Sequence, residues 1–273
     1  MFVITYIFLF SSLIFSNEIY QEVRVYNSTV PFLKSIGIDF DHMHSHHGHF
    51  QFVIDKDDVD KLNFHNVNFD MIHENVESFY QSRLDNNYES RDFELGSMGG
   101  YYTHDEIVDR LNNIASNYPN LTNLISIGNS SQGRDIWAIK LSDNAQYDED
   151  ETEVLYTGLH HSREPMSYMN LFYFMDWLLE NYESDLLAQH LLNNRELWFI
   201  PMINPDGLVY NQLIAPNGGG MQRKNMIETC DNGVDGIDLN RNYSYMWAYD
   251  NEGSSPDGCS ETYRGTSPFS ENE

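Results

Sequence analysis

Apolar residues change their spacing near residue 100, and the two patterns predict two different units. Before that point, short extended runs at 22–26 and 49–54 alternate with helical stretches at 30–36 and 57–62. Runs this short are typical of a small α+β unit. The breaker cluster at 96–100 follows, and we expect it to form an exposed linker and a domain boundary.

Longer helices and strands alternate from residue 101 onward. Thr103 and Glu106 have the spacing of a capping box, and they begin an amphipathic run that ends before Pro119. Strands are expected at 121–127, 136–141, 153–157 and 197–203, and further helices at 165–182 and 185–192. This alternation predicts an α/β sheet with helices on both faces.

Residues 205–273 are rich in Gly, Asn, Asp and Ser, and they predict long loops with little regular structure. Loops of this length in a compact domain are usually functional.

The first sixteen residues form an uncharged apolar run that ends in small residues before Asn17. The run is too short for a bilayer, which takes about 20 residues, so we expect a signal peptide at 1–16, a secreted or secretory-lumen protein and no later membrane span. A signal anchor is the alternative. Sequons at Asn27, Asn120, Asn129 and Asn242 are compatible with a glycoprotein.

The composition narrows the class of protein. The chain has 273 residues, with 42 acidic against 15 basic side chains and a formal net charge of −27. Such a field repels phosphate backbones, so nucleic-acid binding is excluded. With 41% hydrophobic residues the chain can bury a sizeable core. Two cysteines allow one disulfide at most.

His161 and Glu164 lie between the strand predicted at 153–157 and the helix that begins at 165. In open α/β sheets, ligands bind outside the carboxyl ends of strands, which is where this segment must lie. An imidazole and a carboxylate three residues apart can turn toward one point, and both are zinc ligands. Alone the pattern is weak, because a solvated loop explains it equally well.

Four further motifs follow in order: Asn-Pro-Asp-Gly at 204–207, Gln-Arg-Lys at 222–224, Asp-Leu-Asn-Arg-Asn-Tyr at 238–243, and Cys-Ser-Glu-Thr-Tyr at 259–263. In this order and spacing they resemble the zinc carboxypeptidases of the carboxypeptidase A type, over about residues 101–273. The resemblance implies an α/β fold with a mixed central β-sheet flanked by helices. It also implies a hydrolase that binds one Zn²⁺ per catalytic domain and removes single residues from peptide C-termini.

The resemblance assigns a role to each matching residue. His161 and Glu164 match the first two zinc ligands, whereas the neighbouring His160 matches an ordinary strand-end position. Arg223 matches the arginine that polarises the scissile carbonyl, and a fixed guanidinium there would stabilise the developing oxyanion. The remaining substrate contacts fall on Arg163, Asn240 and Arg241, of which the last two match the pair that holds the terminal carboxylate. For all three arginines, surface solvation is the alternative.

The same likeness extends to the overall organisation. Cys230 and Cys259 match a family disulfide, with two free buried thiols as the alternative. Residues 17–98 resemble more loosely a propeptide and linker, and residues 99–273 the first part of a catalytic domain. The expected partners are peptide or protein C-termini and the chain's own propeptide, in a monomer.

Five histidines gather within the propeptide-like segment, at His42, His44, His46, His47 and His49. A metal-binding tract is one interpretation. A polar, solvated turn between strands explains the composition equally well.

The resemblance stops short of the family's third zinc ligand, a histidine, and of its general base, a glutamate. Neither can be assigned on this sequence, and the specificity pocket cannot be assigned either. Two interpretations therefore stay open. One is a zinc metallocarboxypeptidase precursor seen as a partial sequence. The other is a non-catalytic homologue that binds peptide C-termini or a partner without hydrolysis.

Overall fold

The computed structural model of the chain describes residues 19–38, 43–83, 93–230 and 236–273. The predicted signal peptide at 1–16 and His42 lie outside these ranges. Among the helices of the described residues, none has the length and apolar character needed to cross a membrane.

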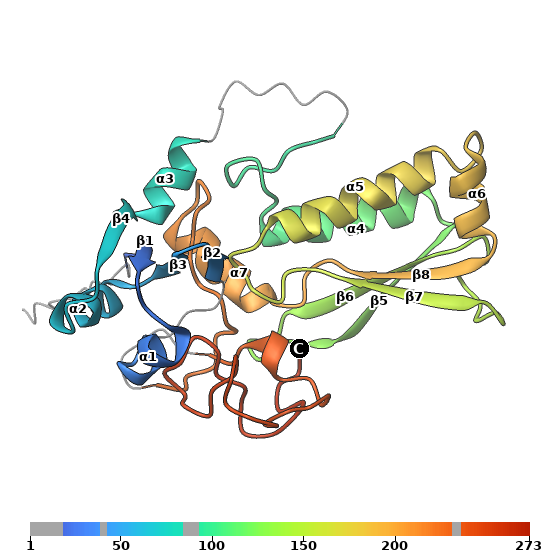
Figure 1. The fold of residues 1–273 in the computed structure, drawn as a ribbon. Helices are drawn as coiled ribbons and strands as arrows, with labels where there is room; N and C mark the ends of the chain where they lie inside the picture. Colours follow the sequence, from blue (N-terminus) through green and yellow to red (C-terminus); the bar gives the residue numbers. More distant parts are fainter. Residues whose placement is uncertain (1–18, 39–42, 84–92, 231–235) are drawn as a thin grey trace, which may run out of the picture.

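The N-terminal unit is a four-stranded antiparallel sheet with short helices (Figure 1). Its strands lie in the order β2-β3-β1-β4. In chain order the elements are β1 (Gln21–Tyr26), α1 (Val30–Ser35), β2 (Met43–His46), β3 (His49–Ile54), α2 (Lys56–Phe64), β4 (Phe69–His73) and α3 (Val76–Ser82). The predicted α+β unit is thus confirmed, and β2, β4 and α3 add to it.

Strand alternation gives this sheet one apolar face and one polar face. Val23 and Val25 of β1 and Phe52 and Ile54 of β3 point into a small core, together with Leu33 of α1. Their neighbours along the strands point the other way. That second face is polar, and it carries Arg24, Tyr26, His44, His46, His49 and Gln51.

The segment at 96–100 is not the exposed linker that its glycines predict. Backbone bridges pair Gly96 with Gly100 and Met98 with Tyr101, and the Met98 side chain is only 4% exposed within the larger core. A Cβ on Gly96 would lie 2.1 Å from the Tyr101 carbonyl oxygen. The glycines here permit a tight, packed turn, so the prediction of a loose connection was wrong.

The larger unit contains a second, mixed sheet in the order β5-β6-β8-β7. Its elements are α4 (His104–Asn117), β5 (Thr122–Asn129), β6 (Asp135–Leu141), β7 (Thr152–Thr157), α5 (Met166–Glu180), α6 (Leu186–Leu192) and β8 (Arg195–Ile200). β5, β6 and β8 pair antiparallel, whereas β7 runs parallel to β8. This is the predicted α/β class with a mixed central sheet.

Local signals explain where these elements begin and end. α4 begins with a complete capping box, in which the Thr103 hydroxyl accepts from the Glu106 backbone and the Glu106 carboxylate accepts from the Thr103 backbone. The last predicted strand runs to 203, but β8 ends at Ile200. Pro201 follows directly, and a proline has no N–H to donate to a sheet ladder.

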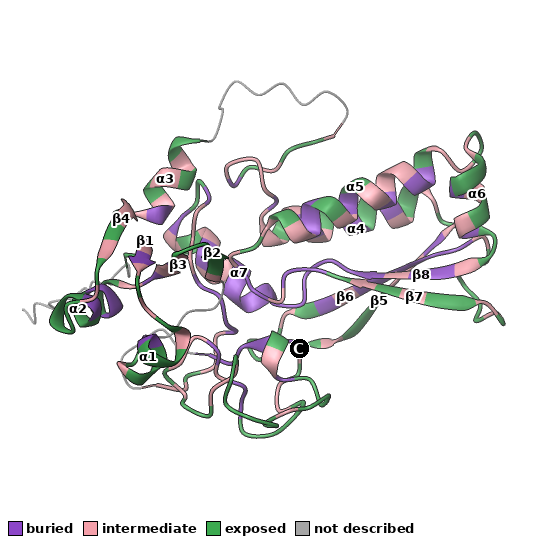
Figure 2. Ribbon diagram, in the orientation of Figure 1, coloured by how far each residue is buried: buried purple, intermediate pink, exposed green. Residues whose placement is uncertain are grey.

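The two faces of this sheet are covered differently. α4 and α5 pack on one face over the main core, which Figure 2 shows as buried segments between helices and strands. Helices were expected on both faces. Among the described residues, the apolar cluster on the other face instead joins Ile136 and Ile200 to Ile203 and to Leu239 of the 3-10 helix η1 (Leu239–Arg241).

One helix in the larger unit was missed by the pattern analysis. α7 (Pro205–Ile214) forms where only loops were predicted. Asn204 caps it by accepting from the Gly207 backbone, and Pro205 occupies its first turn. The remainder, 215–273, is largely irregular as predicted, and η1 is its one described helix. Cys230 and Cys259 form the expected disulfide there.

Candidate functional site

The segment 160–164 lies at the carboxyl end of β7, between that strand and α5, as the sequence predicts. Its backbone is fixed by contacts with the Arg223 backbone and with α7. The Ser162 amide donates to the Arg223 carbonyl at 3.0 Å. α7 packs so closely that a Cβ on Gly207 would lie 2.4 Å from the Ser162 hydroxyl oxygen. The site therefore rests on rigid elements.

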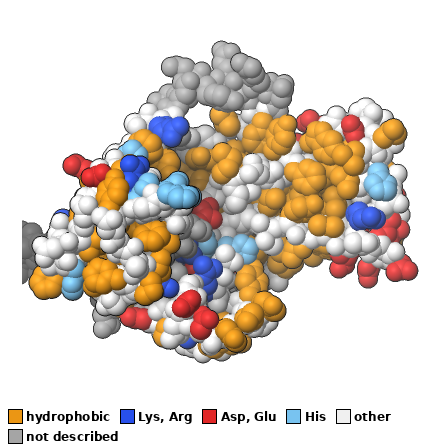
Figure 3. Space-filling model, in the orientation of Figure 1, with side chains coloured by type: hydrophobic (Ala, Val, Ile, Leu, Met, Phe, Trp, Pro, Cys, Tyr) orange, Lys and Arg blue, Asp and Glu red, His pale blue; other side chains and the backbone are white. Residues whose placement is uncertain are grey.

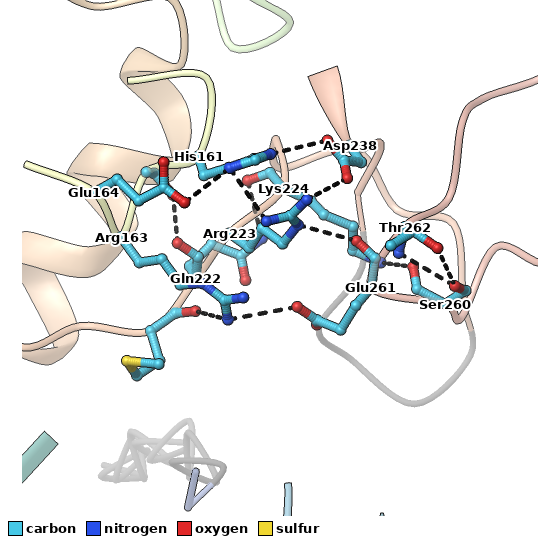
Figure 4. Close-up of polar contacts among 12 residues, drawn as sticks. His161, Arg163, Glu164, Gln222, Arg223, Lys224, Asp238, Ser260, Glu261 and Thr262 are labelled. Atoms are coloured by element: carbon cyan, nitrogen blue, oxygen red, sulfur yellow. Dashed lines mark hydrogen bonds and ion pairs between the residues drawn. The ribbon is translucent and has the colours of Figure 1, made fainter. Parts of the chain in front are cut away.

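His161 lies at the centre of the polar contacts shown in Figure 4. Its Nδ1 is 2.9 Å from Glu164 Oε1, and its Nε2 is 3.1 Å from Asp238 Oδ1. A guanidinium nitrogen of Arg223 lies 3.1 Å from the same Nδ1. The imidazole and carboxylate that the sequence pattern singled out thus converge on one point.

The arrangement around His161 fits a bound cation. With Nε2–H donating to Asp238, Nδ1 presents a lone pair that lies beside a Glu164 oxygen and is approached by the Arg223 guanidinium, so the imidazole and the carboxylate are both free of covalent hydrogen on the side where a metal ion would bind. Zinc ligands at about 2.0–2.2 Å from one tetrahedral ion lie about 3.3–3.6 Å apart, so the observed 2.9 Å needs to widen by only about half an ångström. Asp238 is the carboxylate that such metal-bound histidines usually carry on the other ring nitrogen.

The same contacts determine the protonation of His161. Burial alone would lower the pKa of the imidazole, but hydrogen bonds with Asp238 and Glu164 outweigh it and raise the pKa above its ordinary value. A proton between His161 and Glu164 can therefore supply the positive charge that a metal ion would otherwise provide there. His160, next to it, has a lowered pKa because it is partly buried and lies beside His161.

Asp238 joins the two charged parts of the site. It accepts from His161 through one oxygen, and through the other from an Arg223 guanidinium nitrogen at 2.6 Å. Burial would raise its pKa, yet the hydrogen bond with His161 and the charge of Arg223 bring the pKa down to about 2. Asp238 begins the motif at 238–243, but the motif alone predicted no role for it. Its position two residues before Asn240 is the sequence signal that could have identified it.

Arg223 and Arg163 lie on adjacent sides of this centre. The Arg223 side chain is 1% exposed, and its Nε donates to the Glu261 carbonyl. Arg163 instead reaches the Met221 carbonyl at 3.4 Å and the Glu261 carboxylate at 3.5 Å. Both guanidinium groups are therefore held in place, so neither is the freely solvated surface arginine that the alternative described.

Asn240 and Arg241 belong to η1, directly after Asp238. The Asn240 side chain is exposed, and its backbone amide donates to Asp238 Oδ1 at 3.0 Å. Arg241 donates from Nε to the Gly253 carbonyl at 2.6 Å and is partly exposed. The charge of Arg241 also contributes to the lowered pKa of Asp238, so this guanidinium lies close to the centre.

A cavity of about 690 Å³ opens between the site and the N-terminal unit. Arg163 and Glu164 line one side of it, and Glu22, His44 and Tyr80 line the other. Two contacts bridge the units beside it. The Arg163 guanidinium lies 5.8 Å from the centre of the Tyr20 ring, and the Gln81 amide donates to the Gly218 carbonyl at 3.0 Å.

Three converging metal donors occur once among the described residues, at Asp148, Glu153 and Glu196. This group lies at the start of β8, at the opposite end of the strand from the His161 site. Its buried member, Glu196, is already paired with Lys140 at 2.5 Å. The His161 site itself brings two donors together in the described part of the chain.

The chain matches a family model and several known proteins. The family model described as zinc carboxypeptidase matches residues 107–273. A protein named zinc carboxypeptidase from Saccharothrix mutabilis subsp. capreolus is 39% identical over 158 residues, which cover 58% of this chain and 35% of that protein. A protein named inactive metallocarboxypeptidase ecm14, from Talaromyces stipitatus, is 31% identical over 172 residues, which cover 62% of this chain and 28% of that protein.

Solved structures show the same fold. Carboxypeptidase A from Helicoverpa armigera matches with a TM-score of 0.70 and 24% identity, over 94% of this chain and 64% of that one. A structure of thrombin activatable fibrinolysis inhibitor matches with a TM-score of 0.70 and 22% identity, over 93% and 66%. The chain therefore belongs to the zinc carboxypeptidase family, a family of metallopeptidases. It spans about a third of the Saccharothrix relative.

Proposed function

We propose that this chain carries the active site of a zinc-dependent carboxypeptidase, in which His161 and Glu164 hold the metal ion. In this proposal residues 99–273 belong to the catalytic domain and residues 17–98 form its propeptide-like domain. The observation that carries the proposal is the 2.9 Å approach of His161 Nδ1 to Glu164 Oε1, with Asp238 on the opposite ring nitrogen. Family membership supports zinc as the metal.

Each basic side chain has a distinct task in this reaction. Bound zinc would supply Lewis acidity for the attack of water on a peptide carbonyl. Arg223, beside the donors and shielded from water, stabilises the negative charge that develops on the carbonyl oxygen. Asn240 and Arg241 bind the terminal carboxylate of the substrate, for which a planar guanidinium offers two parallel hydrogen bonds. Arg163 also contacts the substrate.

A non-catalytic peptide-binding protein is the second candidate. It is suggested by the relative whose name describes it as an inactive metallocarboxypeptidase. The two candidates share carboxylate recognition and differ in turnover.

The test is to compare peptides with a free and an amidated C-terminus, with Zn²⁺ present. Arg241→Ala should weaken binding of the free-carboxylate peptide by about tenfold or more, since charged hydrogen bonds contribute about 1.5–3 kcal/mol each. The amidated peptide should bind weakly, and equally so, to the unsubstituted protein and to the variant. Arg195→Ala, at the far end of β8, is the control. Equal loss on both peptides would remove the assigned role of Arg241.

Turnover then separates the two candidates. Release of a single C-terminal residue that a chelator abolishes supports the enzyme. Carboxylate-selective binding without release supports the binding protein. A protein that shows no carboxylate selectivity and releases no residue would contradict both candidates.

The proposed propeptide-like domain lies against the site through Tyr20 and Gln81. Tyr20→Ala removes the ring beside Arg163, so it should increase peptide binding; unchanged binding would argue against a covering role. We also propose that the protein is a secreted precursor. Residues 1–16 fused to a reporter should then carry the reporter into the medium of eukaryotic cells, and retention of the reporter inside the cells would contradict secretion.

A further inference from the structure

The polar face of the N-terminal sheet carries a group of imidazoles that the proposed function does not use. His46 and His49 are direct partners in the β2–β3 register, on either side of a two-residue turn. Their rings stack with centroids 4.9 Å apart and an interplanar angle of 23°. Figure 3 shows histidine side chains gathered on the visible surface of this N-terminal part.

Strand geometry adds a third imidazole to the same face. His44 precedes His46 by two residues on β2, and residues two apart on a strand point to the same side, about 6.5–7 Å from each other. His44 pairs in register with Gln51, which follows His49 by two residues on β3. The three imidazoles therefore form a triangle on one corner of the sheet, at its edge strand.

The surroundings of this triangle suit metal binding. The donor nitrogens of the three rings do not converge on one point in the structure. His44 and His46 are exposed and His49 is half-buried, so the rings can turn toward one another about their side-chain bonds without disturbing the core. Partial burial and the neighbouring charges of Arg24 and His46 lower the pKa of His49. A lowered pKa favours the neutral imidazole, which is the form that binds metal ions. Imidazole ligands suit zinc, copper and nickel.

We propose that His46 and His49, with His44 as the third ligand, form a zinc-binding site on the β2–β3 hairpin that is separate from the His161 site. Bound metal would join the edge strand to its neighbour across the turn, and so stabilise the hairpin in the N-terminal sheet. The proposal does not depend on the function assigned to the larger unit.

The acidic group at Asp148, Glu153 and Glu196 is a weaker candidate for a metal site. Its donor atoms lie close together. However, Lys140 already neutralises Glu196, its buried member.

The test uses the full chain in a His161→Ala background, so that zinc binding at the first site does not contribute. Titration of this variant with ZnCl₂ by calorimetry at pH 7.5 should still show one zinc-binding event. His46→Ala with His49→Ala should weaken it by about tenfold or more. His65→Ala with His190→Ala, which changes two histidines outside this face, should leave it unchanged. Equal affinity in both double variants would overturn the proposal.

Three further measurements distinguish loss of ligands from loss of fold. The variant His46→Asn with His49→Asn keeps polar side chains of similar size, and it should show the same loss of zinc with an unchanged apo circular dichroism spectrum. Zinc should raise the thermal unfolding midpoint in the His161→Ala background and not in either hairpin variant. Lowering the pH to 5 should abolish the binding event because the imidazoles become protonated. Zinc binding that persists at pH 5 would also contradict an imidazole site.

Discussion

Replacing Asp238 by Asn is the sharpest test of how the site is held together. The change keeps the size of the side chain and removes its charge. An amide oxygen can still accept from His161 Nε2, but the amide nitrogen then faces the Arg223 guanidinium, where two donors oppose each other. The substitution therefore breaks the contact with Arg223 and weakens the contact with His161, because it removes the negative charge that both share.

The expected cost follows from burial. The side chain of Asp238 is 0% exposed and that of Arg223 is 1% exposed. Removing one partner of such a buried pair costs about 3–5 kcal/mol, because it leaves an uncompensated charge. Loss of the carboxylate behind a metal-bound histidine should also lower zinc affinity by about 10- to 100-fold.

Two assays measure these effects separately. Urea unfolding followed by tryptophan fluorescence gives the free energy of unfolding, and competition with a chromophoric chelator gives the zinc affinity. Asp109→Asn, an exposed substitution on α4, is the matched control and should stay within about 0.5 kcal/mol. If Asp238→Asn behaved like this control in both assays, Asp238 would not support the site.

Four further outcomes are expected elsewhere in the chain. Lys140→Met leaves Glu196 buried without its partner and should lower the free energy of unfolding by about 3–5 kcal/mol. Lys140→Met with Glu196→Leu should recover most of this loss in urea unfolding. A double variant as unstable as the single one would contradict this. Burial alone would raise the pKa of Glu196, but the hydrogen bond and charge of Lys140, together with the hydrogen bond from the Glu149 backbone, outweigh it and lower the pKa below its ordinary value of 4.5. The pair therefore stabilises the fold above that pH and loses its contribution as the pH falls through the folded-state pKa, so an acid titration of unfolding should be flatter for Lys140→Met. Cys259→Ser opens a loop of sequence separation 29 to Cys230 and should cost roughly 3–4 kcal/mol by the chain-entropy estimate, whereas an unchanged denaturation midpoint would show that the disulfide contributes nothing. Asn242 is 5% exposed and its amide donates to the Arg264 and Ser267 carbonyls, so peptide mapping of protein from a eukaryotic host should find no glycan on its sequon, and a glycan found there would contradict the packing.

Periodicity predicted the elements whose signals are local. The capping box at Thr103 and the amphipathic run behind it gave α4 nearly to the residue. The extended run at 49–54 coincides with β3. In each case the side-chain spacing and the flanking residues point to the same structure, so tertiary contacts had nothing to override.

The predictions for α7 and for the turn at 96–100 were wrong because tertiary contacts determine both structures. α7 was hidden because its residues are buried on several sides, as Leu208 and Asn211 show, and a helix of that kind lacks a clear apolar stripe. Asn204 and Pro205 were nevertheless a readable helix start. The turn at 96–100 was misjudged because glycines permit close packing as readily as flexibility. Only the three-dimensional contact with Tyr101 decides which applies.

The contacts of the candidate site could not be read from spacing alone. His161 and Glu164 are three residues apart, so their convergence is a local property that the pattern anticipates. Asp238 follows His161 by 77 residues in sequence, and Arg223 precedes Asp238 by 15. Only the fold brings these three together. Because Asp238 pairs with His161 and Arg223 through separate oxygens, the metal-binding group and the group that would stabilise the oxyanion share one buried anchor. A change that moves either group must therefore disturb the other. We accordingly expect zinc affinity and the environment of Arg223 to respond together in variants at this position.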